Sequence, residues 1–124
     1  PETIYRAGSI AKVFTAAAAM QLAEQGKIDI DQPLATALPE FSIKTRFPNA
    51  GPVTPRNVMT HHSGLPSNFF KDMFVRDPAR FETVIESIRD EHLTFPPNYV
   101  FSYSNVGMAL LLSLIHISEP TRPY

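Results

Sequence analysis

The residue types with the clearest chemistry are a serine and a lysine three positions apart, Ser9 and Lys12. On a helix, this spacing places two side chains on the same face, within hydrogen-bonding reach. A serine hydroxyl attacks a carbonyl carbon only when a neighbouring base removes its proton, and a lysine serves as that base when burial or a nearby cation lowers its pKa. The pair therefore indicates acyl transfer. The alternative is a surface pattern in which a serine caps a helix and a lysine follows one turn later.

A second group with chemical potential is Tyr103 and Asn105, which flank a tight turn ahead of an apolar segment. A tyrosine beside a lysine cation loses some of its proton affinity and can transfer protons. An asparagine offers a donor and an acceptor to an amide or ester substrate. The alternative is an aromatic core residue followed by a helix cap.

The element that positions the first pair is an apolar helix, expected from about Ser9 to about Gln25. Nearly all of its residues are apolar or small around the whole circumference, which predicts a buried helix. Ser9 suits the N-cap or the first turn, and Gly26 suits the position after the last turn. Burial at the helix start favours Lys12 as a base, and the backbone N–H groups there favour an oxyanion next to Ser9.

Local signals predict further elements along the chain. Thr54 and Pro55 form a typical helix start, and apolar residues recur with helical spacing from Phe81 to Ile88. The predicted elements are a helical turn over 34–38, a loop with a small two-stranded element over 42–53, a helix from Thr54 to about His61, an amphipathic helix over 78–90, and an apolar helix from near Asn105 through Leu112.

Composition limits the function classes. The chain of 124 residues is at most one domain, and its net charge of −1 gives no indication of nucleic acid or an anionic membrane surface as a partner. The absence of cysteine excludes disulfides and thiolate metal sites. No segment is long enough to span a bilayer.

A metal site and a cofactor are not expected. His61 and His62 are adjacent, with no carboxylate at ligand spacing. One stripe rich in phenylalanine is interpreted as core or cleft lining rather than as a cofactor site: Phe69, Phe70, Met73 and Phe74.

Together, Ser9-x-x-Lys12 and Tyr103-x-Asn105 resemble the motifs of the serine β-lactamase and penicillin-binding-protein superfamily. The similarity is greatest to class C β-lactamase-like esterases and peptidases, in which a tyrosine replaces the serine of the Ser-Asp-Asn motif. It covers roughly residues 3 to 112, in the order of the family, and its strongest stretches are 6–12, 20–29, 58–66 and 101–107.

The resemblance implies an α+β fold, made of an α/β sheet and an all-α subdomain, of which this chain holds a mostly α-helical fragment. It implies that Ser9 is the acylated nucleophile, Lys12 its proton partner, Tyr103 the general base and acid, and Asn105 a contact to the substrate amide. The backbone N–H of Ser9 supplies half of the oxyanion hole. The resemblance also implies that His61 and His62 support a loop.

The implied function is a serine hydrolase that acts through an acyl-enzyme on an ester, a D-amino-acid peptide or a β-lactam. The alternative is a non-catalytic penicillin-recognising sensor or a degenerate binding domain. The partner is a small-molecule or peptide substrate, with no nucleic acid, metal or cofactor, and the implied location is periplasmic or secreted, in a bacterium.

Two segments are expected along the chain. Residues 1–112 are predicted to be a partial β-lactamase-like domain, whereas residues 113–124 resemble translated sequencing-adapter sequence and are predicted to be a non-native tail. The resemblance places the family's third motif, Lys/His-x-Gly, well after Tyr103, and no such motif follows Tyr103 in this sequence. We therefore expect an interior fragment that is inactive alone and that exposes part of its Ser9 helix.

Overall fold

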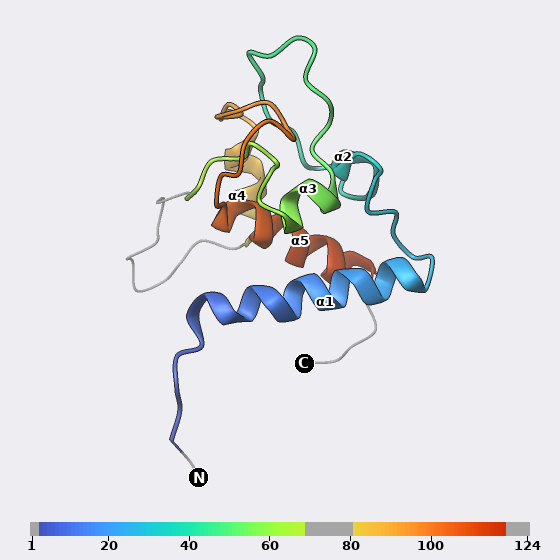
Figure 1. The fold of residues 1–124 in the computed structure, drawn as a ribbon, viewed down its shortest axis with the longest axis vertical. Helices are drawn as coiled ribbons and strands as arrows, with labels where there is room; N and C mark the ends of the chain where they lie inside the picture. Colours follow the sequence, from blue (N-terminus) through green and yellow to red (C-terminus); the bar gives the residue numbers. More distant parts are fainter. Residues whose placement is uncertain (1–2, 69–80, 119–124) are drawn as a thin grey trace.

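The computed structural model describes residues 3–68 and 81–118, which form a mostly helical fold (Figure 1). The elements are a 3₁₀ turn η1 (Gly8–Ile10) and the helices α1 (Ala11–Glu24), α2 (Leu34–Ala37), α3 (Pro55–Met59), α4 (Phe81–Ile88) and α5 (Asn105–Ser118). The described residues contain no β-strand, only one isolated parallel bridge between Lys44 and His92. The expectation of a mostly α-helical chain is confirmed.

The carboxyl end of α1 matches the prediction. Gly26 has a φ of 68°. Its N–H donates to the carbonyl of Ala23 at 2.9 Å, and the N–H of Lys27 donates to the carbonyl of Leu22 at 2.9 Å. This pair of bonds is the Schellman motif, which satisfies carbonyls left open by the last turn. Glycine stops the helix here because it adopts a positive φ without a steric cost.

The predicted burial of α1 is wrong for this chain. Only Ala19 and Leu22 are buried along the helix, whereas Val13 is 68% exposed and Phe14 71% exposed. Figure 1 shows the reason, because α1 lies along one edge of the molecule and α5 packs against one side of it. The start of the helix lacks the expected burial too, since Ser9 is exposed and Lys12 is half-buried. This exposure agrees with the expectation for a fragment.

The core instead surrounds α5, which packs against both α1 and α3. Leu110 and Leu111 are completely buried, and Val58 of α3 and Leu65 of the following loop belong to the same core. The helix extends beyond the predicted Leu112 and ends at Ser118, with Leu114 in the core. The interpretation of residues 113–124 as a non-native tail stays a prediction.

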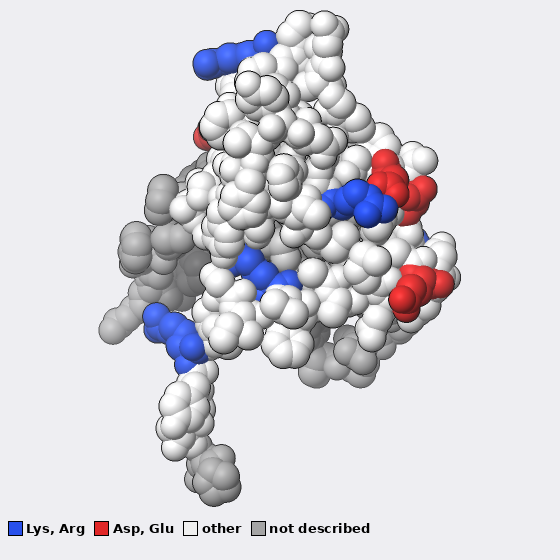
Figure 2. Space-filling model, viewed as in Figure 1, with Lys and Arg blue, Asp and Glu red and all other residues white. Residues whose placement is uncertain are grey.

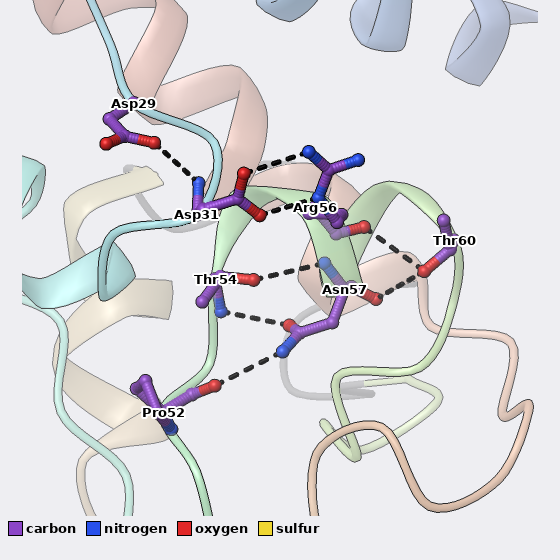
Figure 3. A network of polar contacts seen from close by, with 7 residues as sticks. All are labelled: Asp29, Asp31, Pro52, Thr54, Arg56, Asn57 and Thr60. Atoms are coloured by element: carbon purple, nitrogen blue, oxygen red, sulfur yellow. Dashed lines mark hydrogen bonds and ion pairs between the residues drawn. The ribbon is translucent and has the colours of Figure 1, made fainter.

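The start of α3 is held by a reciprocal capping box, drawn in Figure 3. The Thr54 hydroxyl accepts from the Asn57 N–H at 3.2 Å, and the Asn57 side-chain oxygen accepts from the Thr54 N–H at 2.9 Å. The Asn57 amide also donates to the carbonyl of Pro52 at 3.2 Å. Both ends of a buried amide are thus satisfied, which confirms the predicted helix start at Thr54 and Pro55.

An exposed ion pair joins α3 to the loop that follows α1 (Figure 3). The Arg56 guanidinium donates to both carboxylate oxygens of Asp31, at 2.6 and 2.9 Å. The Asp31 N–H in turn donates to the Asp29 carboxylate at 2.9 Å. Asp29 and Asp31 therefore act in a turn and in an ion pair.

The remaining predicted elements agree in part. α2 occupies the predicted helical turn, and α4 lies within the predicted range 78–90, of which 78–80 are outside the described residues. In the loop over 42–53, Lys44 pairs with His92 in the bridge described above, so the small two-stranded element expected within that loop is not formed there. The predicted aromatic stripe over 69–74 lies outside the described residues.

Charged side chains are dispersed over the face shown in Figure 2, most of which carries uncharged side chains. Within residues 3–68 and 81–118, no helix combines the length and the apolar character that a membrane span requires.

Candidate active site

The structure brings Ser9, Lys12 and Tyr103 together around one oxygen atom. The Lys12 Nζ donates to the Ser9 Oγ at 3.2 Å, and the Tyr103 hydroxyl donates to the same oxygen at 2.8 Å. Ser9 lies in η1 and Lys12 in the first turn of α1, whereas Tyr103 precedes α5. The three side chains therefore form a route along which a proton can pass to or from the serine oxygen.

The local structure leaves the serine side chain available for this contact. Ser9 lies inside the 3₁₀ turn η1, and neither η1 nor α1 is capped by a side-chain hydrogen bond. Ser9 is therefore not the N-cap that the pattern allowed. Its oxygen instead accepts hydrogen bonds from Lys12 and Tyr103.

The Tyr103 phenol is electrostatically tuned by its neighbours. Hydrogen bonding to Lys12 lowers the pKa of Tyr103 most, and hydrogen bonding to Ser9 lowers it further, whereas desolvation acts in the opposite direction. The Lys12 Nζ lies 5.0 Å from the centre of the Tyr103 ring. The lowered pKa increases the phenolate fraction at a given pH, and the phenolate is the form that accepts a proton.

Asn105 is held at the first turn of α5. Its N–H donates to the carbonyl of Ser67 at 2.8 Å, and its side-chain amide donates to the Asn68 side-chain oxygen at 2.6 Å. Asn105 is exposed, so its amide is accessible to a ligand and has a fixed orientation. The sequence interpretation missed Asn68, which carried no spacing signal because its contact is made across the fold.

Ser104 anchors the segment between Tyr103 and Asn105. It is 1% exposed. Its hydroxyl donates to the carbonyl of Pro66 at 2.7 Å and accepts from the N–H of Gly107 at 2.9 Å. This satisfied buried hydroxyl fixes the direction in which the residues on either side leave the backbone.

His61 lies beside the Tyr103 ring, with ring centres 4.4 Å apart. Burial lowers the pKa of His61 most, and the positive charge of Lys12 and the neighbouring His62 lower it further. The imidazole is therefore held in its neutral form near neutral pH. The resemblance had given His61 only a loop-supporting role, and the structure adds a contact to a candidate site residue.

Among residues 3–68 and 81–118, no three or more histidine, aspartate or glutamate side chains gather in a way that holds a metal ion. The polar groups at the candidate site are the hydroxyl, amine, phenol and amide described above.

Comparison with known proteins identifies the family. The family described as Beta-lactamase matches this chain over residues 1–124. The chain belongs to the beta-lactamase family. It is 31% identical over 118 residues to penicillin-binding protein 4 of Amycolatopsis lactamdurans, covering 94% of this chain and 30% of that protein. It is 34% identical over 110 residues to beta-lactamase-like protein 2 of Dictyostelium discoideum, covering 86% of this chain and 20% of that protein.

Solved structures of the family show the same fold. A D-stereospecific amidohydrolase from Streptomyces sp. matches with a TM-score of 0.78 and 28% identity, covering 97% of this chain and 38% of that one. The chain therefore has a beta-lactamase-like fold. It spans 30% and 20% of the two curated relatives named above.

Proposed function

We propose that the protein containing this chain is a serine hydrolase that forms an acyl-enzyme at Ser9. The observation that carries the proposal is the convergence of Lys12 and Tyr103 on the Ser9 Oγ, at 3.2 and 2.8 Å. A serine that accepts hydrogen bonds from two titratable groups has the proton partners that nucleophilic attack requires. Family membership supports a hydrolase of the serine β-lactamase type.

The proposed reaction has two halves. The Ser9 oxygen bonds to the substrate carbonyl carbon while its proton passes to the Tyr103 phenolate, whose formation Lys12 favours. Tyr103 then protonates the leaving group as its bond to the carbonyl carbon breaks, which leaves Ser9 acylated. In the second half, Tyr103 takes a proton from water and the resulting hydroxide attacks the acyl carbon. The bond between that carbon and the Ser9 oxygen then breaks, the carboxylic acid leaves, and Tyr103 returns the proton to the Ser9 oxygen.

The proposed substrates are an ester, a D-amino-acid peptide or a β-lactam. All three present a carbonyl carbon to Ser9, and an amide-bearing substrate can hydrogen-bond to Asn105, whose side chain is oriented by Asn68. A penicillin-binding protein and a D-stereospecific amidohydrolase are among the similar proteins, which supports this range. The proposal includes the periplasmic or secreted location that the resemblance implies.

The experiment uses the natural reading frame that contains this chain, expressed as wild type, Ser9→Ala and Tyr103→Phe. A fluorescent penicillin reports a covalent adduct, and p-nitrophenyl butyrate reports ester turnover. The proposal predicts labelling or turnover that disappears in Ser9→Ala and falls strongly in Tyr103→Phe. A folded wild type that reacts with neither reagent would support the non-catalytic binding domain instead.

The chain of 124 residues by itself is proposed to be inactive, because no Lys/His-x-Gly motif follows Tyr103 in this sequence, where the resemblance places it. Turnover of p-nitrophenyl butyrate by the purified chain, abolished by Ser9→Ala, would contradict this part of the proposal.

A further inference from the structure

His61 occupies a position at which glycine is the usual residue. Its φ is 58°. Its N–H donates to the carbonyl of Val58 at 3.1 Å, and the N–H of His62 donates to the carbonyl of Asn57 at 2.7 Å. This is the Schellman motif again, at the end of α3, with histidine where α1 has Gly26. For a residue with a Cβ atom, this backbone conformation is unfavourable by about 1–2 kcal/mol.

The cost is accompanied by three contacts to the segment around Tyr103. The carbonyl of His61 accepts from the N–H of Ser102 at 2.7 Å. The His61 Nδ1 accepts from the N–H of Ser104 at 3.2 Å. The His61 ring stacks on the Tyr103 ring, with centres 4.4 Å apart and planes tilted by 33°. One residue thus contacts the residue before Tyr103, the residue after it, and its side chain.

We propose that His61 is a positioning residue for Tyr103, which keeps the phenol hydroxyl at the Ser9 oxygen by holding the backbone on both sides of Tyr103 and by stacking on its ring. The inference rests on the proposed function, because it assigns His61 to the proton-transfer step of that reaction. It explains why a side chain is present at a turn that glycine forms at lower cost.

The protonation state of His61 follows from these contacts. An Nδ1 atom that accepts from the Ser104 N–H carries no proton, so the neutral ring holds its proton on Nε2. The titratable groups that face the ring are Lys12, His62 and Tyr103. Protonation would turn the Nδ1 acceptor into a donor that opposes the Ser104 N–H, and it would place a second cation near Lys12.

His62 provides a matched control in the adjacent position. Its Nδ1 donates to the carbonyl of Thr60 at 2.8 Å. Its ring meets the Phe101 ring edge-on, with centres 5.8 Å apart. A change at His62 therefore removes an imidazole from the same loop while the contacts of His61 to Tyr103 and Ser104 stay in place.

The test compares His61→Gly, His61→Asn and His62→Asn in the natural reading frame that contains this chain. Glycine keeps the positive φ and the carbonyl contact but removes the ring and the Nδ1 acceptor. Asparagine also tolerates this backbone conformation and keeps an acceptor that can reach the Ser104 N–H. Folding of each variant is checked by circular dichroism.

Two readouts separate positioning from simple support of a loop. The first is the acylation rate with a fluorescent penicillin and the kcat and KM for p-nitrophenyl butyrate. The second is the ultraviolet titration of Tyr103, obtained as the difference between each variant and the same variant carrying Tyr103→Phe. The titration needs no turnover, so it decides the role of His61 even where wild type and Ser9→Ala are equally unreactive and the proposed function fails.

We expect His61→Gly to lower the acylation rate and kcat by roughly 10- to 100-fold with little change in KM, the size of loss that a small misplacement of a catalytic group causes. The pKa of Tyr103 should rise toward its ordinary value, because the hydrogen bonds to Lys12 and Ser9 that lower it are loosened. His61→Asn should show a smaller loss of acylation rate and kcat, and His62→Asn should have the acylation rate and kcat of the wild type.

A folded His61→Gly variant with the wild-type Tyr103 titration and acylation rate would overturn the inference. Equal losses of acylation rate and kcat in folded His61→Gly, His61→Asn and His62→Asn variants would overturn the inference as well. The losses would then come from a disturbed loop rather than from the missing contacts of His61. Where neither His61 variant folds, the ¹⁵N spectrum of the wild-type imidazole decides: an unprotonated Nδ1 at neutral pH is expected, and a protonated one overturns the inference.

Discussion

α1 and α5 are equally long apolar helices, and each contributes to the candidate site at its amino end, but their environments differ. Seven residues of α5 are buried, against two of α1. α5 packs against both α1 and α3, whereas α1 has α5 on one side only. Apolar composition therefore predicts a helix in both cases, but it does not predict how much of either helix is buried. The elements that pack against each helix determine its burial. Most of the length of the similar proteins has no counterpart in this chain.

The largest effect should come from the core of α5. Leu111 is completely buried, so Leu111→Ala should lower the free energy of unfolding by about 2–5 kcal/mol through lost burial and a cavity. Val13 of α1 is 68% exposed, so Val13→Ala should change it by less than about 0.5 kcal/mol. Urea unfolding of the chain measures the change in unfolding free energy for both variants. Similar changes at the two positions would contradict the difference in burial between α1 and α5.

The end of α1 should matter more than its exposed face. Gly26 has a φ of 68°, and an added Cβ would meet no atom within 4 Å, so Gly26→Ala carries the backbone cost alone. We expect the free energy of unfolding to fall by about 1 kcal/mol. At Gly64, with a φ of 71°, an added Cβ would also collide with the carbonyl oxygen of Phe95, so Gly64→Ala should cost more. Equal losses in urea unfolding would contradict this reading of the two turns.

The contact between His61 and the segment before α5 should make stability depend on pH. The fold lowers the pKa of His61 from its usual 6.5, chiefly by burial. Below pH 6.5 the unfolded chain therefore binds protons that the folded chain does not, and stability falls as pH falls, until the folded pKa is passed. The decrease in unfolding free energy between neutral and acid pH should be smaller in His61→Asn. An identical pH profile would contradict the assignment.

The smallest effect should come from the ion pair between Asp31, in the loop after α1, and Arg56 of α3. Arg56 lowers the pKa of Asp31 from 3.8, mainly through its hydrogen bonds. The contribution of this pair is present above pH 3.8 and is lost as pH falls through the folded pKa. Asp31→Asn should therefore cost less than Gly26→Ala at neutral pH, because exposed pairs contribute little. A cost above that of Gly26→Ala would contradict this ranking.

Local chemistry made much of the fold predictable from the sequence. Gly26 ends α1 and Thr54 with Pro55 starts α3, because each signal acts on its own backbone within a few residues. The spacing of Ser9 and Lys12 likewise gave their contact. These are contacts within one turn of helix, which sequence patterns describe well.

Contacts between segments far apart in the chain were less predictable from the sequence. The pairing of Lys44 with His92, the orientation of Asn105 by Asn68, and the stacking of His61 on Tyr103 all depend on how segments far apart in the chain come together. No local signal marked His61, because glycine is the usual residue with a positive φ at a helix end and a histidine there is not predicted from sequence.

Ser9 is proposed to be a nucleophile that exchanges protons with Lys12 and Tyr103. The most direct measurement is intact-protein mass spectrometry of the protein encoded by the natural reading frame, after incubation with penicillin, followed by peptide mapping. We predict one added penicilloyl mass on the peptide that contains Ser9, and no such mass in Ser9→Ala. An adduct on another residue, or none on a folded protein that also leaves p-nitrophenyl butyrate intact, would contradict it.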